Sequence, residues 1–227
     1  MRADLGSEWR SEFADFADQP VAAASIGQVH RAKLASSGED VAVKVQFPGV
    51  QESIESDLGY LRWLLLASAV LPRGLFLDAS LDNFKRELAD ECDYVREGEA
   101  MQEMRENILS SGDEMAAFAV PKVHSALTSP RVLTAEWMNG EPLTKATEYP
   151  QELRDWVSLW PHRRHVSSGA DLRAQIGTSM LRLCLHELFS YSLMQTDPNW
   201  SNFLYDRQRR QVREGMCRTC ISDEWHA

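Results

Sequence analysis

The stretch that decides the fold is residues 20–49, which read PVAAASIGQVHRAKLASSGEDVAVKVQFPG. Apolar residues alternate along the chain on both sides of ASSGED, so we expect a β-hairpin over residues 20–47. The second strand of this hairpin carries Lys44 between valines. A buried ammonium is costly unless it reaches an acidic partner. Lys44 therefore either pairs with a carboxylate or faces solvent from an edge strand.

The chain turns helical after this hairpin. Apolar residues recur every three or four positions in residues 50–71, at Ile54, Leu58, Leu61 and Leu65. We expect a second, strongly acidic helix through residues 81–107, capped by Asp78 or Ser80. This helix offers Lys44 the carboxylates of Glu87, Glu91, Asp93 and Glu97. Kinases use a strand lysine paired with a helix glutamate to orient the α- and β-phosphates of ATP.

The rest of the chain adds short strands and a further helix. Residues 118–143 predict two short strands joined by a Ser-Pro turn. A long helix is expected over residues 172–194, with a buried stripe of Ile176, Met180, Leu183, Leu188 and Leu193. Residues 157–174 form a polar, turn-rich insert with no clear place in these elements. Strands and helices are therefore segregated along the chain, which predicts the α+β fold class.

A second candidate for chemistry is the loop TDPNWSNFLYD, residues 196–206. Asp197 and Asn202 stand five residues apart, which is the spacing that protein kinases use for the catalytic base and a magnesium ligand. The carboxylate orients the attacking oxygen while the amide oxygen holds the metal, so the chemistry needs both groups. Asp-Pro-Asn is also ordinary turn chemistry. The pair therefore gains weight from the lysine strand and the acidic helix that precede it.

Residues 22–28 lie where a kinase carries glycines over the phosphates, yet they are mostly alanine, with Gly27 as the one glycine. Glycine lets a backbone approach phosphates closely and with positive φ, whereas alanine adds a methyl group and restricts φ. We therefore expect a stiffer loop that still binds nucleotide through backbone N–H groups, in a changed pose. The alternative is that the alanines merely pack.

Composition excludes several other classes of protein. The net charge of -10 excludes a general nucleic-acid binder, which needs a basic stripe. Four scattered cysteines are too few for a disulfide framework and indicate a reducing compartment. The polar, acidic start predicts neither a secretory signal nor a transit peptide. The most apolar stretch, residues 60–77, contains Arg62 and Pro72 and is too interrupted to span a bilayer.

Several long motifs occur together in this chain: AAASIGQVH, VAVKVQFPGVQESIESD, LPRGLFLD, RELADECDY, VPKVHSALTSPRVLTAEWMNGEPL and LHELFSYSLMQTDPNWSNFLYD. These motifs strongly resemble the UbiB / aarF-domain family of atypical kinases, and its mitochondrial ubiquinone-biosynthesis members most of all. The resemblance covers residues 8–206 apart from the insert. It implies a two-lobed, protein-kinase-like fold of the α+β class.

The resemblance also implies roles for particular residues. The nucleotide-binding set, from the alanine loop, the lysine strand, the acidic helix and the hinge, comprises Ala24, Lys44, Glu97, Ala135, Glu136, Trp137 and Met138. Glu91 and Asp93 form the regulatory Glu-x-Asp motif of the family. Asp197 corresponds to the catalytic aspartate and Asn202 to a metal ligand. The implied cofactors are ATP or ADP with Mg²⁺.

Two departures from the family pattern shape the expected domains. The Lys-x-Gly-Gln motif is absent, and no Asp-Phe-Gly follows Asn202. We therefore expect a truncated copy with an N-terminal lobe over residues 1–138, an incomplete C-terminal lobe over residues 139–206 and a disordered tail over residues 207–227. Because the Asp-Phe-Gly aspartate holds Mg²⁺ in kinases, metal binding should be impaired and turnover weak or absent.

The function implied by the resemblance is an atypical kinase or ATPase that supports ubiquinone biosynthesis in the mitochondrion. Its further partners would be ubiquinone-biosynthesis enzymes and a lipid or membrane surface. A cytoplasmic location is the alternative. Two other functions stay open: a non-catalytic nucleotide-sensing or lipid-binding scaffold of a biosynthetic complex, and a small-molecule kinase of the aminoglycoside phosphotransferase type.

Overall fold

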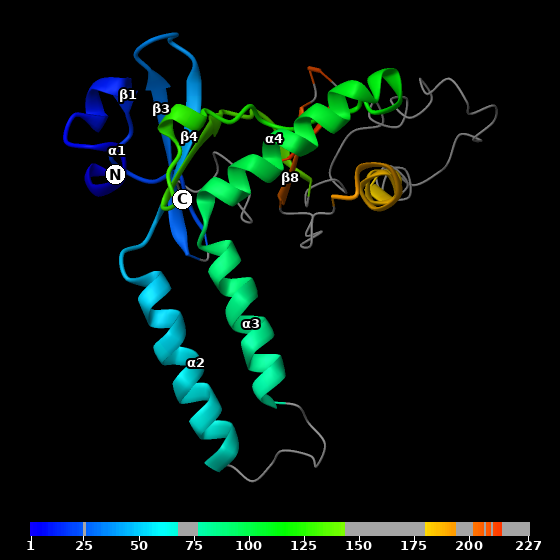
Figure 1. The fold of residues 1–227 in the computed structure, drawn as a ribbon. Coiled ribbons are helices and arrows are strands. Elements are labelled where there is room, and N and C mark those ends of the chain that lie inside the picture. Colours follow the sequence, from blue (N-terminus) through cyan, green and yellow to red (C-terminus); the bar gives the residue numbers. More distant parts are fainter. Residues whose placement is uncertain are drawn as a thin grey trace. The chain divides into compact units, whose positions relative to one another are not determined.

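The computed structural model describes residues 1–24, 26–67, 77–143, 180–193, 202–206, 208–209 and 211–214 (Figure 1). The chain divides into two compact units. The N-terminal unit comprises Met1–Glu99 and Val123–Glu136, and the C-terminal unit comprises Ala100–Lys122 and Trp137–Ala227. A single boundary after residue 138 therefore does not describe the chain, because residues 100–122 belong with the C-terminal unit.

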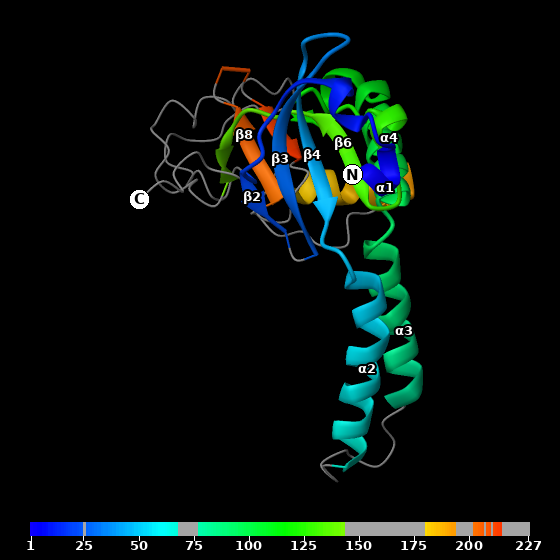
Figure 2. The ribbon, with the colours of Figure 1, turned by 90° about the vertical axis from the view of Figure 1, so that its left-hand side faces the viewer.

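The N-terminal unit is built on an antiparallel sheet in the order β1-β3-β4-β6 (Figure 2). Its strands are β1 (Phe13–Phe16), β3 (Gly27–Leu34), β4 (Asp40–Gln46) and β6 (Val132–Glu136), and the short β2 (Ala22–Ala23) also pairs with β3. The predicted hairpin is confirmed as β3 and β4. Gly38 lies in its turn with a φ of 71°, in the left-handed region that favours glycine.

The two faces of this sheet differ in what they bury. Side chains alternate along a strand, so the valines of β4 share one face. That face carries the core cluster of Phe13, Ala32, Leu34, Val41, Val43 and Val132. Residues from α1 (Arg2–Leu5) and the 3-10 helix Trp9–Glu12 pack against this cluster. Lys44 and Gln46 point to the opposite face, where both are buried.

Two helices, α2 (Val50–Ala67) and α3 (Leu77–Glu91), follow β4 and run side by side in both views (Figures 1 and 2). Helix α2 confirms the predicted helix that begins near residue 50. The expected single helix over residues 81–107 is wrong. The chain breaks at Cys92 and Asp93 and continues as a separate helix, α4 (Tyr94–Ser110).

The break between α3 and α4 is stabilised by an N-terminal cap. The Oδ1 atom of Asp93 accepts hydrogen bonds from the backbone N–H groups of Val95 at 3.1 Å and Arg96 at 3.3 Å. These N–H groups have no partner within their own helix, so an aspartate in this position stabilises the start of α4. In a sequence rich in acidic residues, an aspartate that caps a new helix cannot be told from one inside a continuous helix. The hydrophobic periodicity therefore did not indicate the break between α3 and α4.

The C-terminal unit contains a second sheet, in the order β5-β9-β8-β7. Its strands are β5 (Phe118–Ala119), β9 (Gln211–Glu214), β8 (Phe203–Asp206) and β7 (Glu141–Pro142). Strand β5 runs parallel to β9, and this pairing helps to place residues 100–122 in the C-terminal unit. Strand β9 falls within residues 207–227, for which disorder was predicted. Residues 211–214 form this strand, and Val212 is buried.

The helix before the predicted catalytic loop is described from residue 180 onward. Residues 180–186 are helical and lead into a π-helical turn, Glu187–Tyr191. Leu183 is buried as predicted, but Leu188 is exposed and Glu187 is buried instead. Residues 183 and 187 are one turn apart and share a face, which explains the exchange. Within the described residues, no helix is long and apolar enough to cross a membrane.

Removing the cap of α4 should destabilise the N-terminal unit. We expect Asp93→Ala to lower the free energy of unfolding by about 1 kcal/mol, the usual effect of losing an N-cap. Urea denaturation measures the change. Asp82→Ala on the exposed side of α3 is the matched control and should leave the unfolding midpoint unchanged. Equal midpoints for the two variants would contradict the capping role.

Candidate functional site

The centre of the candidate site is an ion pair between Lys44 and Glu97. The Nζ atom of Lys44 lies 2.8 Å from both Oε1 and Oε2 of Glu97. The lysine side chain is 8% exposed and the glutamate side chain is 33% exposed. The predicted ammonium–carboxylate contact is therefore present, and the solvent-facing alternative for Lys44 is wrong. Both hydrogen bonds are charge-assisted, which makes them short and strong.

Helix α4 approaches the sheet closely enough to make this contact because Gly98 follows Glu97. A Cβ atom at Gly98 would lie 3.2 Å from Cδ1 of Leu133 and 3.3 Å from Cγ1 of Val123. Glycine therefore lets the first turns of α4 pack against β6 and the segment before it. The carboxylate of Glu97 is brought over the middle of β4 by this packing.

The alanine-rich loop forms a tight antiparallel hairpin. Ala22 lies opposite Val29 and Ala23 opposite Gln28, and the N–H of Ala24 donates to the carbonyl oxygen of Gly27 at 2.8 Å. Ser25 lies outside the described residues. The loop is thus closed by backbone hydrogen bonds on both sides of its tip. The nucleotide-binding role of Ala24 stays a prediction.

Gly27 is required by the backbone that it faces. A Cβ atom at this position would lie 2.5 Å from the carbonyl oxygen of Val45 and 2.9 Å from the Oη atom of Tyr94. Real Cβ contacts of this length do not occur, and a backbone carbonyl cannot move aside cheaply. The single glycine of the loop therefore lies where an alanine would collide with β4.

The predicted hinge residues lie where the two units meet along the chain. Ala135 is fully buried in β6 opposite Ala42, and Glu136 ends the strand opposite Val41. The division between the units falls between Glu136 and Trp137. Trp137, Met138 and the residues that follow connect β6 to β7. Their contact with adenine stays a prediction.

The Glu-x-Asp pair is divided between two structural positions. Glu91 is the last residue of α3, whereas Asp93 caps α4 as described above. The residue between them, Cys92, is buried. Burial, together with the nearby Glu91 carboxylate, raises the pKa of the Cys92 thiol. Cys92 therefore behaves as a small core group at neutral pH and not as a thiolate nucleophile.

The predicted catalytic loop is described only from Asn202 onward. Asn202 is buried directly before β8. Asp197 lies outside the described residues, as does the insert over residues 157–174. The arrangement of Asp197 relative to Asn202 therefore stays a prediction. Among the described residues, no group of three or more His, Cys, Asp or Glu side chains could hold a metal ion.

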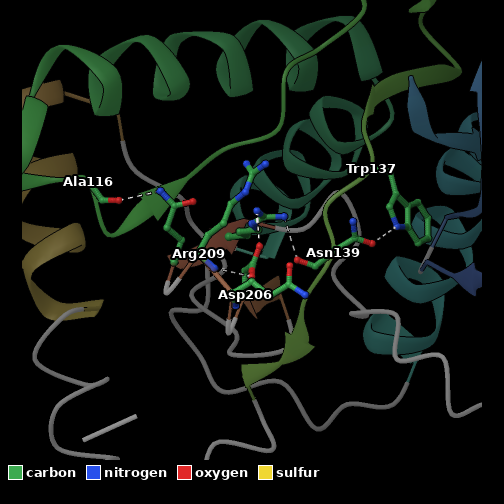
Figure 3. A network of polar contacts seen from close by, with 8 residues as sticks. Ala116, Trp137, Asn139, Asp206 and Arg209 are labelled. Atoms are coloured by element: carbon green, nitrogen blue, oxygen red, sulfur yellow. Dashed lines mark hydrogen bonds and ion pairs between the residues drawn. The ribbon is translucent and has the colours of Figure 1, made fainter. Parts of the chain in front are cut away.

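Asp206 occupies the end of β8 and is held in a polar network in which Arg213 is buried (Figure 3). One carboxylate oxygen lies 2.5 Å from Nη2 of Arg213, and the other accepts the backbone N–H groups of Gln208 and Arg209 at 2.8 and 3.0 Å. Arg213 also donates to the carbonyl oxygen of Asn139 at 3.1 Å. Trp137 donates its ring N–H to the side chain of Asn139 (Figure 3). This network joins β8, β9 and the segment before β7.

Sequence reasoning missed Tyr94 and Gln46. The Nζ atom of Lys44 lies 4.5 Å from the centroid of the Tyr94 ring, and Gln46 donates its side-chain amide to the carbonyl oxygen of Cys92 at 3.1 Å. Tyr94 could have been found from its spacing, because it precedes Glu97 by three residues and shares its helix face. Gln46 follows Lys44 by two residues and therefore lies on the same face of the strand.

Comparisons with known proteins agree with this architecture. A family model described as the ABC1 atypical kinase-like domain matches residues 1–221. The chain is 42% identical over 212 residues to the atypical kinase COQ8B, mitochondrial, of Danio rerio, covering 93% of this chain and 30% of the relative. It is 41% identical over 212 residues to the atypical kinase COQ8, mitochondrial, of Saccharomyces cerevisiae, covering 93% of this chain and 38% of the relative. The chain thus spans well under half the length of these curated relatives.

A solved structure extends the comparison to the fold. The complex of Rv3197 with erythromycin from Mycobacterium tuberculosis is similar with a TM-score of 0.71 at 27% sequence identity. The match covers 94% of this chain and 48% of that chain. The predicted resemblance and the kinase-like α+β fold are confirmed by these matches.

The two partners of the ion pair should differ in their effect on stability. Glu97→Ala leaves a buried ammonium without its carboxylate, so we expect a loss of about 3 kcal/mol in the free energy of unfolding. Lys44→Met leaves a carboxylate that water can reach, so we expect a loss of about 1 kcal/mol. Urea denaturation measures both. Glu99→Ala, on an exposed position of α4, is the control and should have no effect. A larger loss for Lys44→Met than for Glu97→Ala would contradict this account.

Proposed function

Because the chain belongs to the ABC1 family of atypical kinase-like domains, we propose that it binds ATP or ADP as part of an atypical kinase or ATPase of ubiquinone biosynthesis. The motif resemblance and the COQ8 names of its relatives support this assignment. The same relatives are called mitochondrial, and we assign the protein to the mitochondrion on that basis. Biosynthetic enzymes and a lipid surface are its proposed partners.

The observation that carries the proposal is the Lys44–Glu97 ion pair. In kinases a strand lysine, oriented by a helix glutamate, contacts the phosphates of ATP. Here the ammonium is buried on the face of β4 opposite the valine core, and the glutamate holds it with both oxygens. A fixed cation of this kind can exchange part of its carboxylate contact for phosphate oxygens. Its position is then set before the nucleotide arrives.

The other proposed nucleotide contacts follow from the family resemblance. The alanine hairpin of Ala24 would cover the phosphates through its backbone N–H groups. The backbone of Ala135, Glu136, Trp137 and Met138 would hydrogen-bond adenine. Asp197 would orient the attacking oxygen at the γ-phosphate.

Among the described residues, the side chains do not fit a firmly held Mg²⁺. Asn202 is the predicted ligand, and its neutral amide is a weak partner for a hard divalent cation that prefers charged oxygens. The nearest described carboxylate along the chain, Asp206, is already paired with Arg213 and with two backbone N–H groups. We therefore derive no catalytic step through the metal.

A second candidate function follows from this metal chemistry. A chain that binds nucleotide but holds Mg²⁺ weakly would act as a nucleotide-sensing scaffold of a biosynthetic complex. The engagement of Asp206 in a structural ion pair favours this candidate. Steady ATP hydrolysis would separate it from the enzyme.

The nucleotide proposal is tested at Lys44. We expect Lys44→Met to weaken the binding of ADP by about tenfold or more, because an ammonium–phosphate contact is charge-assisted. Isothermal titration calorimetry measures the dissociation constant. Lys33→Met is the matched control, since Lys33 is exposed on the neighbouring strand β3 and should leave ADP affinity unchanged. Unchanged ADP affinity in Lys44→Met would remove the proposal.

Weak binding of Mg²⁺ predicts low turnover. We expect steady-state phosphate release from ATP by the purified protein to be several powers of ten below that of yeast COQ8, because charge in the transition state is not neutralised by a well-held ion. Addition of Mg²⁺ should change ADP affinity little. Asn202→Asp supplies a charged oxygen at the same place and should make ADP binding more dependent on Mg²⁺. Magnesium-dependent hydrolysis equal to that of the yeast protein would contradict this prediction.

A further inference from the structure

Tyr94 is the buried neighbour of the candidate phosphate-binding lysine. Its side chain is completely buried, and the Lys44 ammonium lies 4.5 Å from the centroid of its ring. An ammonium at this distance from an aromatic face is attracted by the negative charge of the ring, and the attraction is strongest where water is excluded. Lys44 is therefore held on two sides, by the carboxylate of Glu97 and by the ring of Tyr94.

The backbone around Tyr94 is anchored to the sheet. The N–H of Tyr94 donates to the carbonyl oxygen of Pro130 at 3.1 Å, in the turn before β6. Two residues before Tyr94, the carbonyl oxygen of Cys92 accepts a hydrogen bond from the side-chain amide of Gln46, at the end of β4, at 3.1 Å. Asp93 between them caps α4. The ring is thus positioned by three separate connections and not by packing alone.

The far end of the ring reaches the base of the alanine hairpin. A Cβ atom at Gly27 would lie 2.9 Å from the Oη atom of Tyr94, so the hydroxyl occupies the space that a side chain at Gly27 would need. Gly27 begins β3 and accepts the hydrogen bond from Ala24 that closes the loop. The Tyr94 side chain therefore contacts Lys44 at one end and β3 at the other. It projects from α4, the helix that also carries Glu97.

We propose that Tyr94 is a positioning residue for nucleotide phosphates, whose ring holds the Lys44 ammonium in place and sets it relative to the alanine hairpin. This inference rests on the proposed phosphate-binding role of Lys44. Tyr94 itself does not have to touch the nucleotide. Loss of the ring should weaken ligands that carry phosphates and leave the binding of adenosine unchanged.

The test compares ligands with and without phosphates in variants of the purified protein. We expect Tyr94→Leu, which keeps apolar volume but removes the ring, to weaken ADP binding by about tenfold. The same variant should bind adenosine as the parent does. Tyr94→Phe should stay within about twofold of the parent for ADP, because the ring face is retained. Tyr60→Leu, at an exposed position on α2, is the matched control and should change neither affinity.

A series of isosteric variants keeps the test independent of folding. Phenylalanine analogues with successively more ring fluorines at position 94 retain the shape of the ring while the negative charge of its face decreases. ADP affinity should fall stepwise along this series at constant adenosine affinity. Equal ADP affinity across the series, or a parallel loss of adenosine affinity, would overturn the inference.

A double variant separates this inference from the proposed function. If Tyr94 acts through Lys44, then Tyr94→Leu should add no further loss of ADP affinity in a Lys44→Met background. An additional tenfold loss there would overturn the positioning role while leaving the role of Lys44 intact. Unchanged ADP affinity in Lys44→Met alone would overturn both proposals together.

Discussion

The structure of the N-terminal unit depends on one buried positive charge. Lys44 lies in the middle of β4 with its side chain almost completely removed from water. Desolvation of an ammonium is tolerated only where other groups replace its hydration. Glu97 supplies both carboxylate oxygens and Tyr94 supplies an aromatic face. Both residues belong to the first turn of α4, so the helix must begin at a fixed place relative to the sheet.

The start of α4 accounts for several features that otherwise look unrelated. The chain leaves the helical conformation at Cys92 and Asp93, and Asp93 caps the new helix. Gln46, on the same strand face as Lys44, binds the carbonyl oxygen of Cys92. Gly98 allows the helix to lie close to β6. The Glu-x-Asp motif thus has a structural basis in this chain, because its aspartate fixes the helix that carries the lysine's partner.

The alanine-rich loop combines a hydrogen-bonded hairpin with one indispensable glycine. Backbone hydrogen bonds close the hairpin at Ala22, Ala23 and Ala24, so its conformation does not require the φ values that glycine alone adopts. Gly27 is different, since a Cβ atom there would collide with β4 and with Tyr94. In the C-terminal unit, the carboxylate of Asp206 has a structural role, because it forms an ion pair with Arg213. Gly27 and Asp206 therefore both have defined structural roles.

The sequence by itself determined the β3–β4 hairpin and helix α2, and it limited Lys44 to two choices, a carboxylate partner or solvent. These follow from alternation, from a period near 3.6 and from the cost of a buried ammonium, all of which act over short distances or through charge. Tertiary structure decided that Lys44 is buried against a carboxylate and does not face solvent, and it decided where the acidic helix breaks. It also decided that Glu187 and not Leu188 faces inward, and that residues 211–214 pair with β5. It also placed Tyr94 beneath Lys44. These outcomes depend on contacts between segments far apart in the chain, and no local pattern records which segments will meet.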